Sequence, residues 1–201
     1  MTDANRARLG LSPAPELRWV TLVASLQLIF VTLVLNWLGR LWWCPWGDAA
    51  IWVSSPASPH TSQHFLDPYT FSHVCHGLIF ALFLASTCSS LSVSIRFVIS
   101  IALEGAWEIL ENTPLIINRY RESTAALGYE GDSIANSIAD MVSCCIGFYM
   151  ATRIGWRYTL VLIGCIELAM LITIRDSLLL NIVMLCYPLD AIRQWQLSQA
   201  N

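Results

Sequence analysis

The chain has 201 residues, of which 56% are hydrophobic and only 12% are charged, and its mean hydropathy is +0.57. This composition is too apolar for an ordinary soluble domain and predicts an integral membrane protein. All eleven basic residues are arginines, the net charge is −3, and no basic tail indicates binding to nucleic acid.

The first predicted element is a transmembrane helix from Trp19 to Leu38. Its apolar run carries no charge and is bounded by Arg18 and Arg40. The run is longer than a signal-peptide core and has no small-residue cleavage site after it, so we expect an uncleaved first span. Residues 1–18 are then a polar tail, predicted to be cytoplasmic.

Residues 40–70 change to an aromatic, proline-rich and serine-rich composition. Pro45, Pro56, Pro59 and Pro68 oppose a continuous helix, which predicts a periplasmic loop lying partly at the membrane interface. Cys44 falls in this loop, where it is either an unpaired thiol or a local ligand. The other six cysteines stand in apolar runs and are expected to be small buried hydrophobes. They are Cys75, Cys88, Cys144, Cys145, Cys165 and Cys186.

Several further segments have the length and composition of membrane spans. The fold class is therefore all-α: a single transmembrane helical bundle over residues 19–195 with five to six spans and a second periplasmic loop at 118–131. The last segment has a proline at position 188 and either crosses with a kink or lies against the bundle. The predicted spans are Phe71–Leu91, Ile95–Ile117, Asp132–Thr152, Tyr158–Ile174 and, as the sixth, Asp176–Trp195.

The placement of arginines predicts that the N-terminus is cytoplasmic, because short cytoplasmic loops are enriched in basic residues. In this orientation seven arginines flank the cytoplasmic side and four the periplasmic side. The first group is Arg6, Arg8, Arg18, Arg96, Arg153, Arg157 and Arg193; the second is Arg40, Arg119, Arg121 and Arg175.

The third predicted helix carries three glutamates inside its apolar sequence. Glu104, Glu108 and Glu111 lie within about 60° of one another on a helical wheel, so they share one stripe. Carboxylates that close cannot all stay ionised in a low dielectric without a cation, an arginine or a histidine nearby. We therefore expect a buried polar site rather than a solvated helix face.

The neighbouring helices carry matching polar groups. Asp132, Asn136 and Asp140 follow one face of the fourth helix, among small serines that favour close packing. His73 and His76 lie one turn apart on the second helix, where they either make structural hydrogen bonds or bind a metal. With the N-terminus inside, these three stripes meet in the periplasmic half of the membrane.

The predicted periplasmic loops add candidates for binding an anion at the same level. They hold His64 ahead of the second helix, and Arg119 and Arg121 ahead of the fourth. The arginines either neutralise the carboxylates or bind an anionic ligand, as guanidinium groups commonly do.

Three long strings resemble a known family. They are SQHFLDPYTFSHVCHG (62–77), LEGAWEILENTPLIINRYRESTAALGYEGDSIANSIADMVSCCIGF (103–148) and RDSLLLNIVMLCYPLDAIRQWQ (175–196). The chain from about residue 37 onward is similar to uncharacterised protein family 0314, a domain of unknown function in alphaproteobacterial multi-pass membrane proteins. The resemblance implies the inner membrane and brings no activity or ligand.

The residues themselves leave three hypotheses open. The first is a metal-dependent membrane hydrolase or transferase that acts on a lipid-linked or periplasmic substrate, because mixed histidine and carboxylate ligands suit Zn, Fe or Mn. The second is a cation- or proton-coupled transporter or small-ligand binder, and the third is a scaffold or assembly factor. For the first, the metal ligands are His73, His76, Glu108 and Asp132; the catalytic carboxylates are Glu104, Glu111 and Asp140; and the groups binding substrate are Arg119, Arg121, Asn136 and His64.

Overall fold

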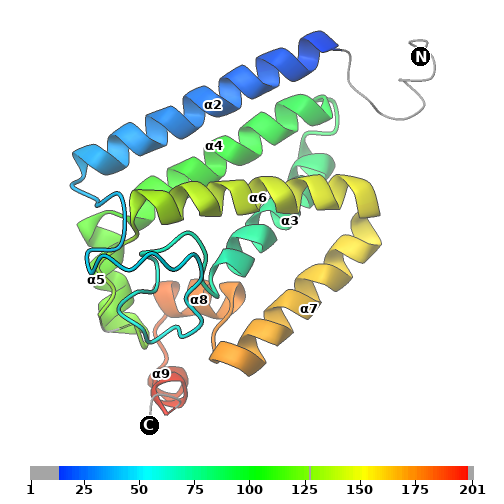
Figure 1. Ribbon diagram of the computed structural model, residues 1–201. Coiled ribbons are helices and arrows are strands. Elements are labelled where there is room, and N and C mark those ends of the chain that lie inside the picture. Colours follow the sequence, from blue (N-terminus) through cyan, green and yellow to red (C-terminus); the bar gives the residue numbers. More distant parts are fainter. Residues whose placement is uncertain (1–13, 127, 199–201) are drawn as a thin grey trace.

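The computed structural model describes residues 14–126 and 128–198 and confirms the all-α class (Figure 1). Within these residues it has eight helices and no strand, with one isolated bridge between Trp52 and Leu66. The helices are α2 (Ala14–Trp37), α3 (Thr70–Thr87), α4 (Val93–Glu111), α5 (Pro114–Ser123), α6 (Ile134–Ile154), α7 (Trp156–Ile174), α8 (Leu178–Cys186) and α9 (Asp190–Leu197).

Four of the described helices, α2, α3, α6 and α7, are long and apolar enough to cross a membrane. Large apolar side chains such as Ile29, Phe30 and Leu33 are more than half exposed on α2, as expected for a surface that contacts lipid. Helix α4 has 19 residues and so is about 28 Å long, but Arg96 and its glutamates raise its charge. The helices thus have the character of a membrane protein.

The closest helix packing is between α3 and α6, and two glycines permit it. A Cβ atom at Gly77 would collide with the backbone carbonyl of Cys144, and one at Gly147 would collide with the carbonyl of Val74. Only glycine allows two helix backbones to approach this closely. The contact fixes the register of the histidines on α3 against the aspartate on α6.

The loop between α2 and α3, together with α5, α8 and α9, lies at one end of the bundle, opposite the α3–α4 turn (Figure 1). This loop, residues 38–69, satisfies the first backbone amides of α6. Ser133 N donates to Ser62 O over 2.8 Å, Ile134 N to Leu41 O over 2.8 Å, and Ala135 N to Trp42 O over 3.3 Å. Helix N-termini leave such amides without partners, so the loop completes α6.

The structure changes the bounds of three predicted spans. Helix α3 ends at Thr87 rather than Leu91. Helix α4 ends at Glu111 rather than Ile117, because Pro114 begins the separate helix α5, whose last residues occupy the start of the predicted 118–131 loop. The fourth predicted helix begins at Ile134, with Ser133 as its N-cap, rather than at Asp132.

The C-terminal segment 176–195 forms two helices of nine and eight residues separated at Pro188, each only about 12 to 14 Å long and too short to span. The Arg193 side chain donates to Thr124 O, beyond the end of α5, and so lies at the loop end of the bundle. This leaves six arginines on the predicted cytoplasmic side and five on the other, so the orientation stays a prediction.

The cysteine prediction is partly correct. Cys75 and Cys144 are buried between helices, and Cys88 and Cys145 are half-buried, but Cys165 and Cys186 are exposed on α7 and α8. The apolar runs around them cover the outside of the bundle, a surface that hydropathy cannot distinguish from the core.

Candidate metal centre

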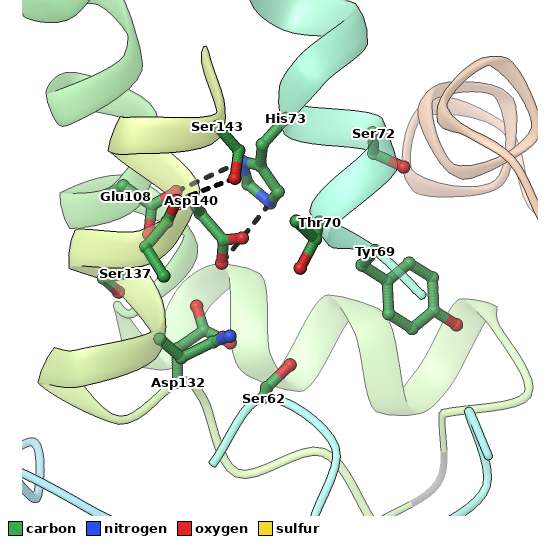
Figure 2. A network of polar contacts seen from close by, with 12 residues as sticks. Ser62, Tyr69, Thr70, Ser72, His73, Glu108, Asp132, Ser137, Asp140 and Ser143 are labelled. Carbon is green, nitrogen blue, oxygen red and sulfur yellow. Dashed lines mark hydrogen bonds and ion pairs between the residues drawn. The ribbon is translucent and has the colours of Figure 1, made fainter. Parts of the chain in front are cut away.

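Helices α3, α4 and α6 bring four of the sequence-predicted site residues into one buried cluster. His73 comes from α3, Glu104 and Glu108 from α4, and Asp140 from α6. Figure 2 shows the His73 ring pointing from α3 toward Glu108 and Asp140. The two glutamates are fully buried, and the other two residues are at most 7% exposed.

The two nitrogens of His73 face different carboxylates. Nδ1 lies 2.6 Å from Glu104 Oε1 and 3.4 Å from Glu108 Oε1, whereas Nε2 lies 3.8 Å from Asp140 Oδ2. The short contact makes Nδ1–H the donor to Glu104, so a neutral ring presents the Nε2 lone pair to Asp140. A carboxylate on one imidazole nitrogen and a metal on the other is the usual second-shell arrangement of metal-binding histidines.

Glu104 also accepts a hydrogen bond from the second histidine. His76 Nδ1 lies 2.9 Å from Glu104 Oε2. Oε1 of this carboxylate lies 2.6 Å from His73 Nδ1 and 3.2 Å from His76 Nδ1, so Glu104 orients both rings. Glu104, predicted as a catalytic carboxylate, is thus fully occupied by hydrogen bonds to the two histidines.

Glu108 and Asp140 carry buried oxygens with no hydrogen-bond partner among the described residues, although Glu108 Oε1 lies at ion-pair distance from His73. Neither carboxylate oxygen of Glu108 accepts a hydrogen bond, and neither does Oδ1 of Asp140. Buried polar atoms in native proteins are nearly always satisfied, by protein, water or an ion. Unpaired acceptors beside an imidazole lone pair are the donor set that a divalent cation requires.

The distances are compatible with one ion. A donor atom from each of His73, Glu108 and Asp140 lies within 4.8 Å of the other two. Ligands about 2.0 to 2.2 Å from a tetrahedral ion stand about 3.3 to 3.6 Å apart, so the three donor atoms would have to draw closer around a bound ion. Three protein ligands leave a coordination position open.

A pocket of about 180 Å³ adjoins the cluster. It is lined by His73, His76 and Trp107, by Glu111 and Tyr120, and by α8 residues including Asn181. Glu111 therefore faces this pocket rather than the carboxylates one turn earlier on its helix.

Tyr69, which also lines the pocket, donates to Asp176 Oδ2 over 3.1 Å. Burial raises the pKa of Asp176 to about 6.

Asp132 lies outside the cluster, at the end of the bundle (Figure 2). Asn112 donates to its Oδ2 over 2.9 Å, and Tyr129 donates to its Oδ1 over 2.9 Å. Burial raises the pKa of Asp132, although these hydrogen bonds oppose the shift. A carboxylate this well satisfied is a structural anchor. Asn112 and Tyr129 were not singled out from the sequence. Asn112 continues the i, i+4, i+8 spacing of Glu104 and Glu108 and could have been included on that ground, whereas Tyr129 lies in a loop without a periodic pattern.

The predicted anion-binding residues are dispersed. Arg119 Nε donates to Leu185 O over 2.7 Å at the end of α8, and Arg121 Nε donates to Tyr129 O. Asn136 Nδ2 donates to Phe65 O over 3.5 Å. These groups hold loops and helix ends, so they do not form one site.

Residues 35–198 match the family model described as a protein of unknown function, DUF2585. The chain belongs to the DUF2585 family. It is 43% identical to a UPF0314 protein of Sphingopyxis alaskensis over 175 residues, which are 87% of this chain and 93% of the relative. A UPF0314 protein of Sinorhizobium fredii is 39% identical over 97% of this chain and 95% of its own, and one of Agrobacterium fabrum is 40% identical over 94% and 96%. No solved structure matches.

The family match confirms the resemblance seen in the three strings. The DUF2585 region begins near the end of α2 and includes the α2–α3 loop and every residue of the buried cluster. His64 belongs to this region but lies in that loop, next to Cys44 and His60. It therefore groups with those two residues and not with the buried cluster on α3, α4 and α6.

Proposed function

We propose that this DUF2585 protein is a multi-pass inner-membrane metalloenzyme with a cytoplasmic N-terminus. His73, Glu108 and Asp140 bind one divalent ion of the Zn, Fe or Mn class, and the ion activates water to hydrolyse a lipid-linked or periplasmic substrate. The observation that carries the proposal is the set of unpaired oxygens on Glu108 and Asp140 beside His73. A structural ion pair would leave no such acceptors.

The open coordination position and the adjoining pocket suit hydrolysis. An ion held by His73, Glu108 and Asp140 would lower the pKa of a bound water and so supply the nucleophile for a phosphoryl or carbonyl centre. Glu111, which lines the pocket, would accept the proton of that water and pass it to the leaving-group oxygen as the bond between that oxygen and the centre breaks. His76 and Glu104 keep His73 in the tautomer that binds metal.

Packing beyond the cluster favours this function over transport across the membrane. Farther from the loop end, α3 and α6 are sealed by an apolar cluster of Leu78, Ala81, Leu84, Phe148 and Ala151. Each of these side chains is at most 7% exposed. An ion pathway requires polar groups or water along its length, and this half of the α3–α6 contact offers none among the described residues.

Metal analysis of the purified protein tests the proposal. We expect Asp140→Asn and Glu108→Gln each to lose one equivalent of transition metal per chain relative to wild type. Glu122→Gln, which removes an exposed carboxylate on α5, is the matched control and should keep the full content. Identical metal content in all four proteins would refute the site. Metal loss without any hydrolysis of phospholipid or lipid-linked phosphate would refute the enzymatic part alone.

A further inference from the structure

A second cluster of metal-binding side chains lies in the α2–α3 loop, outside the helices. Cys44 Sγ is 3.3 Å from His60 Nδ1, and His60 Nδ1 is 3.3 Å from His64 Nε2. Asp48 Oδ2 is 3.7 Å from each of the two imidazole nitrogens. We call these four residues the loop cluster.

Ordinary hydrogen bonding does not account for the loop cluster. His60 Nδ1 has a sulfur, a nitrogen and an oxygen within 3.7 Å, yet this atom either carries one proton or accepts one. Bonds of about 2.0 to 2.1 Å to nitrogen or oxygen and 2.3 Å to sulfur place the ligands of a tetrahedral ion about 3.3 to 3.6 Å apart. The two 3.3 Å contacts match this spacing, and donor atoms of Cys44, His60 and His64 all lie within 4.8 Å of one another. The Asp48 oxygen, 3.7 Å from both rings, joins them as the fourth ligand only after its exposed side chain moves toward Cys44.

The local sequence shapes the loop around this point. Gly47 adopts a φ of +71°, and its amide donates to Cys44 O over 3.2 Å, which closes a turn that returns Asp48 toward Cys44. The other oxygen of Asp48 accepts from Ala50 N over 2.9 Å, so Oδ2 is aimed at the histidines. His60 and His64 follow the H-x3-H spacing common at zinc sites.

Two of the four side chains are buried, and aromatic rings pack against both histidines. Cys44 is 5% and His64 1% exposed, and the two tryptophan rings of Trp43 and Trp46 pack against His64 and His60 at centroid distances of 5.2 and 5.0 Å. Nδ1 of His64 has no hydrogen-bond partner in the described part of the chain. The polar contacts of this buried ring are therefore those of its Nε2 within the loop cluster.

We infer that Cys44, Asp48, His60 and His64 bind a tetrahedral zinc ion that holds the loop in place. One sulfur, two nitrogens and one carboxylate oxygen complete the coordination, and four protein ligands are the mark of a structural rather than a catalytic zinc. This site is separate from the proposed catalytic one, because it shares no residue with it and lies on a loop instead of the helices.

The zinc acts on the bundle through the carbonyls that complete α6. The Leu41 carbonyl, which accepts from the Ile134 amide, precedes Cys44 by three residues, and the Ser62 carbonyl, which accepts from the Ser133 amide, lies between His60 and His64 in the sequence. Fixing the loop therefore fixes the start of α6, the helix that carries Asp140. Because a structural metal contributes its binding free energy to folding, loss of zinc should loosen this end first.

Cobalt substitution tests the inference, because only the loop cluster contains sulfur. The full-length protein in detergent is stripped with a chelator and titrated with Co²⁺. We expect a thiolate-to-cobalt charge-transfer absorption that saturates at one equivalent per chain, persists in Glu108→Gln and in Cys165→Ser, and disappears in Cys44→Ser. Wild-type protein without this absorption, or an absorption that survives Cys44→Ser, would overturn the site.

An exposed ligand provides the test if Cys44→Ser does not fold. Asp48 has a side chain 46% exposed, so Asp48→Asn should fold and retain the thiolate absorption. We expect its cobalt affinity to drop about 10- to 100-fold or more, because even outer-shell changes weaken metal sites that much. Glu130→Gln removes an exposed carboxylate in the loop between α5 and α6 and should leave the cobalt affinity unchanged. Equal affinities for Asp48→Asn and wild type would contradict the four-ligand assignment.

Discussion

The two proposed metal centres are built in opposite ways. The loop cluster takes all its ligands from residues 44–64, surrounds them with backbone turns and aromatic rings, and leaves no coordination position open. The buried centre takes one ligand from each of three helices and keeps acceptors unpaired beside a pocket. A closed local site serves stability, whereas an open site assembled by tertiary packing retains unsatisfied groups that chemistry can use.

The largest expected effect comes from a substitution that disrupts the buried centre and leaves the loop cluster intact. Gly147→Ala places a methyl group against the Val74 carbonyl, and neither helix backbone can yield without moving α3 from α6. We expect a loss of about 3 kcal/mol or more in unfolding free energy. Thermal unfolding in detergent measures this loss, together with release of metal from the buried centre and retention of the cobalt–thiolate absorption.

The matched control for this change is Gly164→Ala on α7. A Cβ atom there meets nothing within 4 Å, so alanine should be neutral or raise stability by up to about 1 kcal/mol through its helix propensity. Equal stability of the two variants would show that the α3–α6 contact is looser than described.

The next effect concerns pH on the pocket side of the buried centre. Because burial raises the pKa of Asp176 from 3.8 to about 6, the folded state holds this proton more tightly than the unfolded chain. Stability of the metal-free protein should be highest below pH 4 and fall by at most about 3 kcal/mol as pH rises to 6.

Unfolding measured from pH 4 to 7 tests this, with Asp176→Asn expected to reduce the slope. The part that remains belongs to other buried carboxylates such as Asp132, whose pKa burial also raises. Asp190→Asn, at an exposed carboxylate on α9, should retain the full slope. The metal-loaded loop cluster should respond in the opposite direction, because protons compete with metal for its ligands as pH falls. A slope as steep in Asp176→Asn as in wild type would assign the titration to another group.

A smaller effect tests whether the carboxylates of the buried centre lower the stability of the metal-free protein. Glu108→Gln removes a carboxylate whose oxygens have no partner, so the metal-free variant should be more stable than metal-free wild type by about 1 to 3 kcal/mol. The measurement is unfolding after chelation. Destabilisation on this substitution would mean that Glu108 has a stabilising partner in the folded protein.

The smallest effect probes the junction that both centres share. Ser133 Oγ accepts from Asn136 N over 3.1 Å as the N-cap of α6, and Ser133→Ala should cost about 1 kcal/mol. Zinc should reduce this loss of stability, because a zinc-ordered α2–α3 loop still supplies carbonyl acceptors to the first turn of α6. The cost in unfolding free energy is therefore compared with and without zinc, and an equal cost would mean that zinc does not order this end.

The sequence predicted the helical bundle and the meeting of three polar stripes, because hydrophobic length and the 3.6-residue period are local properties. It also placed His73, Glu108 and Asp140 on facing helices. It did not separate Asp132 from them, because that requires knowing that Asn112 and Tyr129 satisfy its carboxylate. Nor did it group His64 with Cys44, because loop geometry depends on turns such as the one at Gly47 rather than on a period.

The capping of α6 by the loop has a consequence for biogenesis. The carbonyls of Leu41 and Trp42 leave the ribosome about ninety residues before the amides that they accept, Ile134 and Ala135. The first turn of α6 is therefore finished only after the intervening helices have been made and the loop has folded back against it. If the loop cluster binds zinc as we propose, zinc would decide when a newly made chain matures, so the protein's abundance would follow the zinc available to the loop.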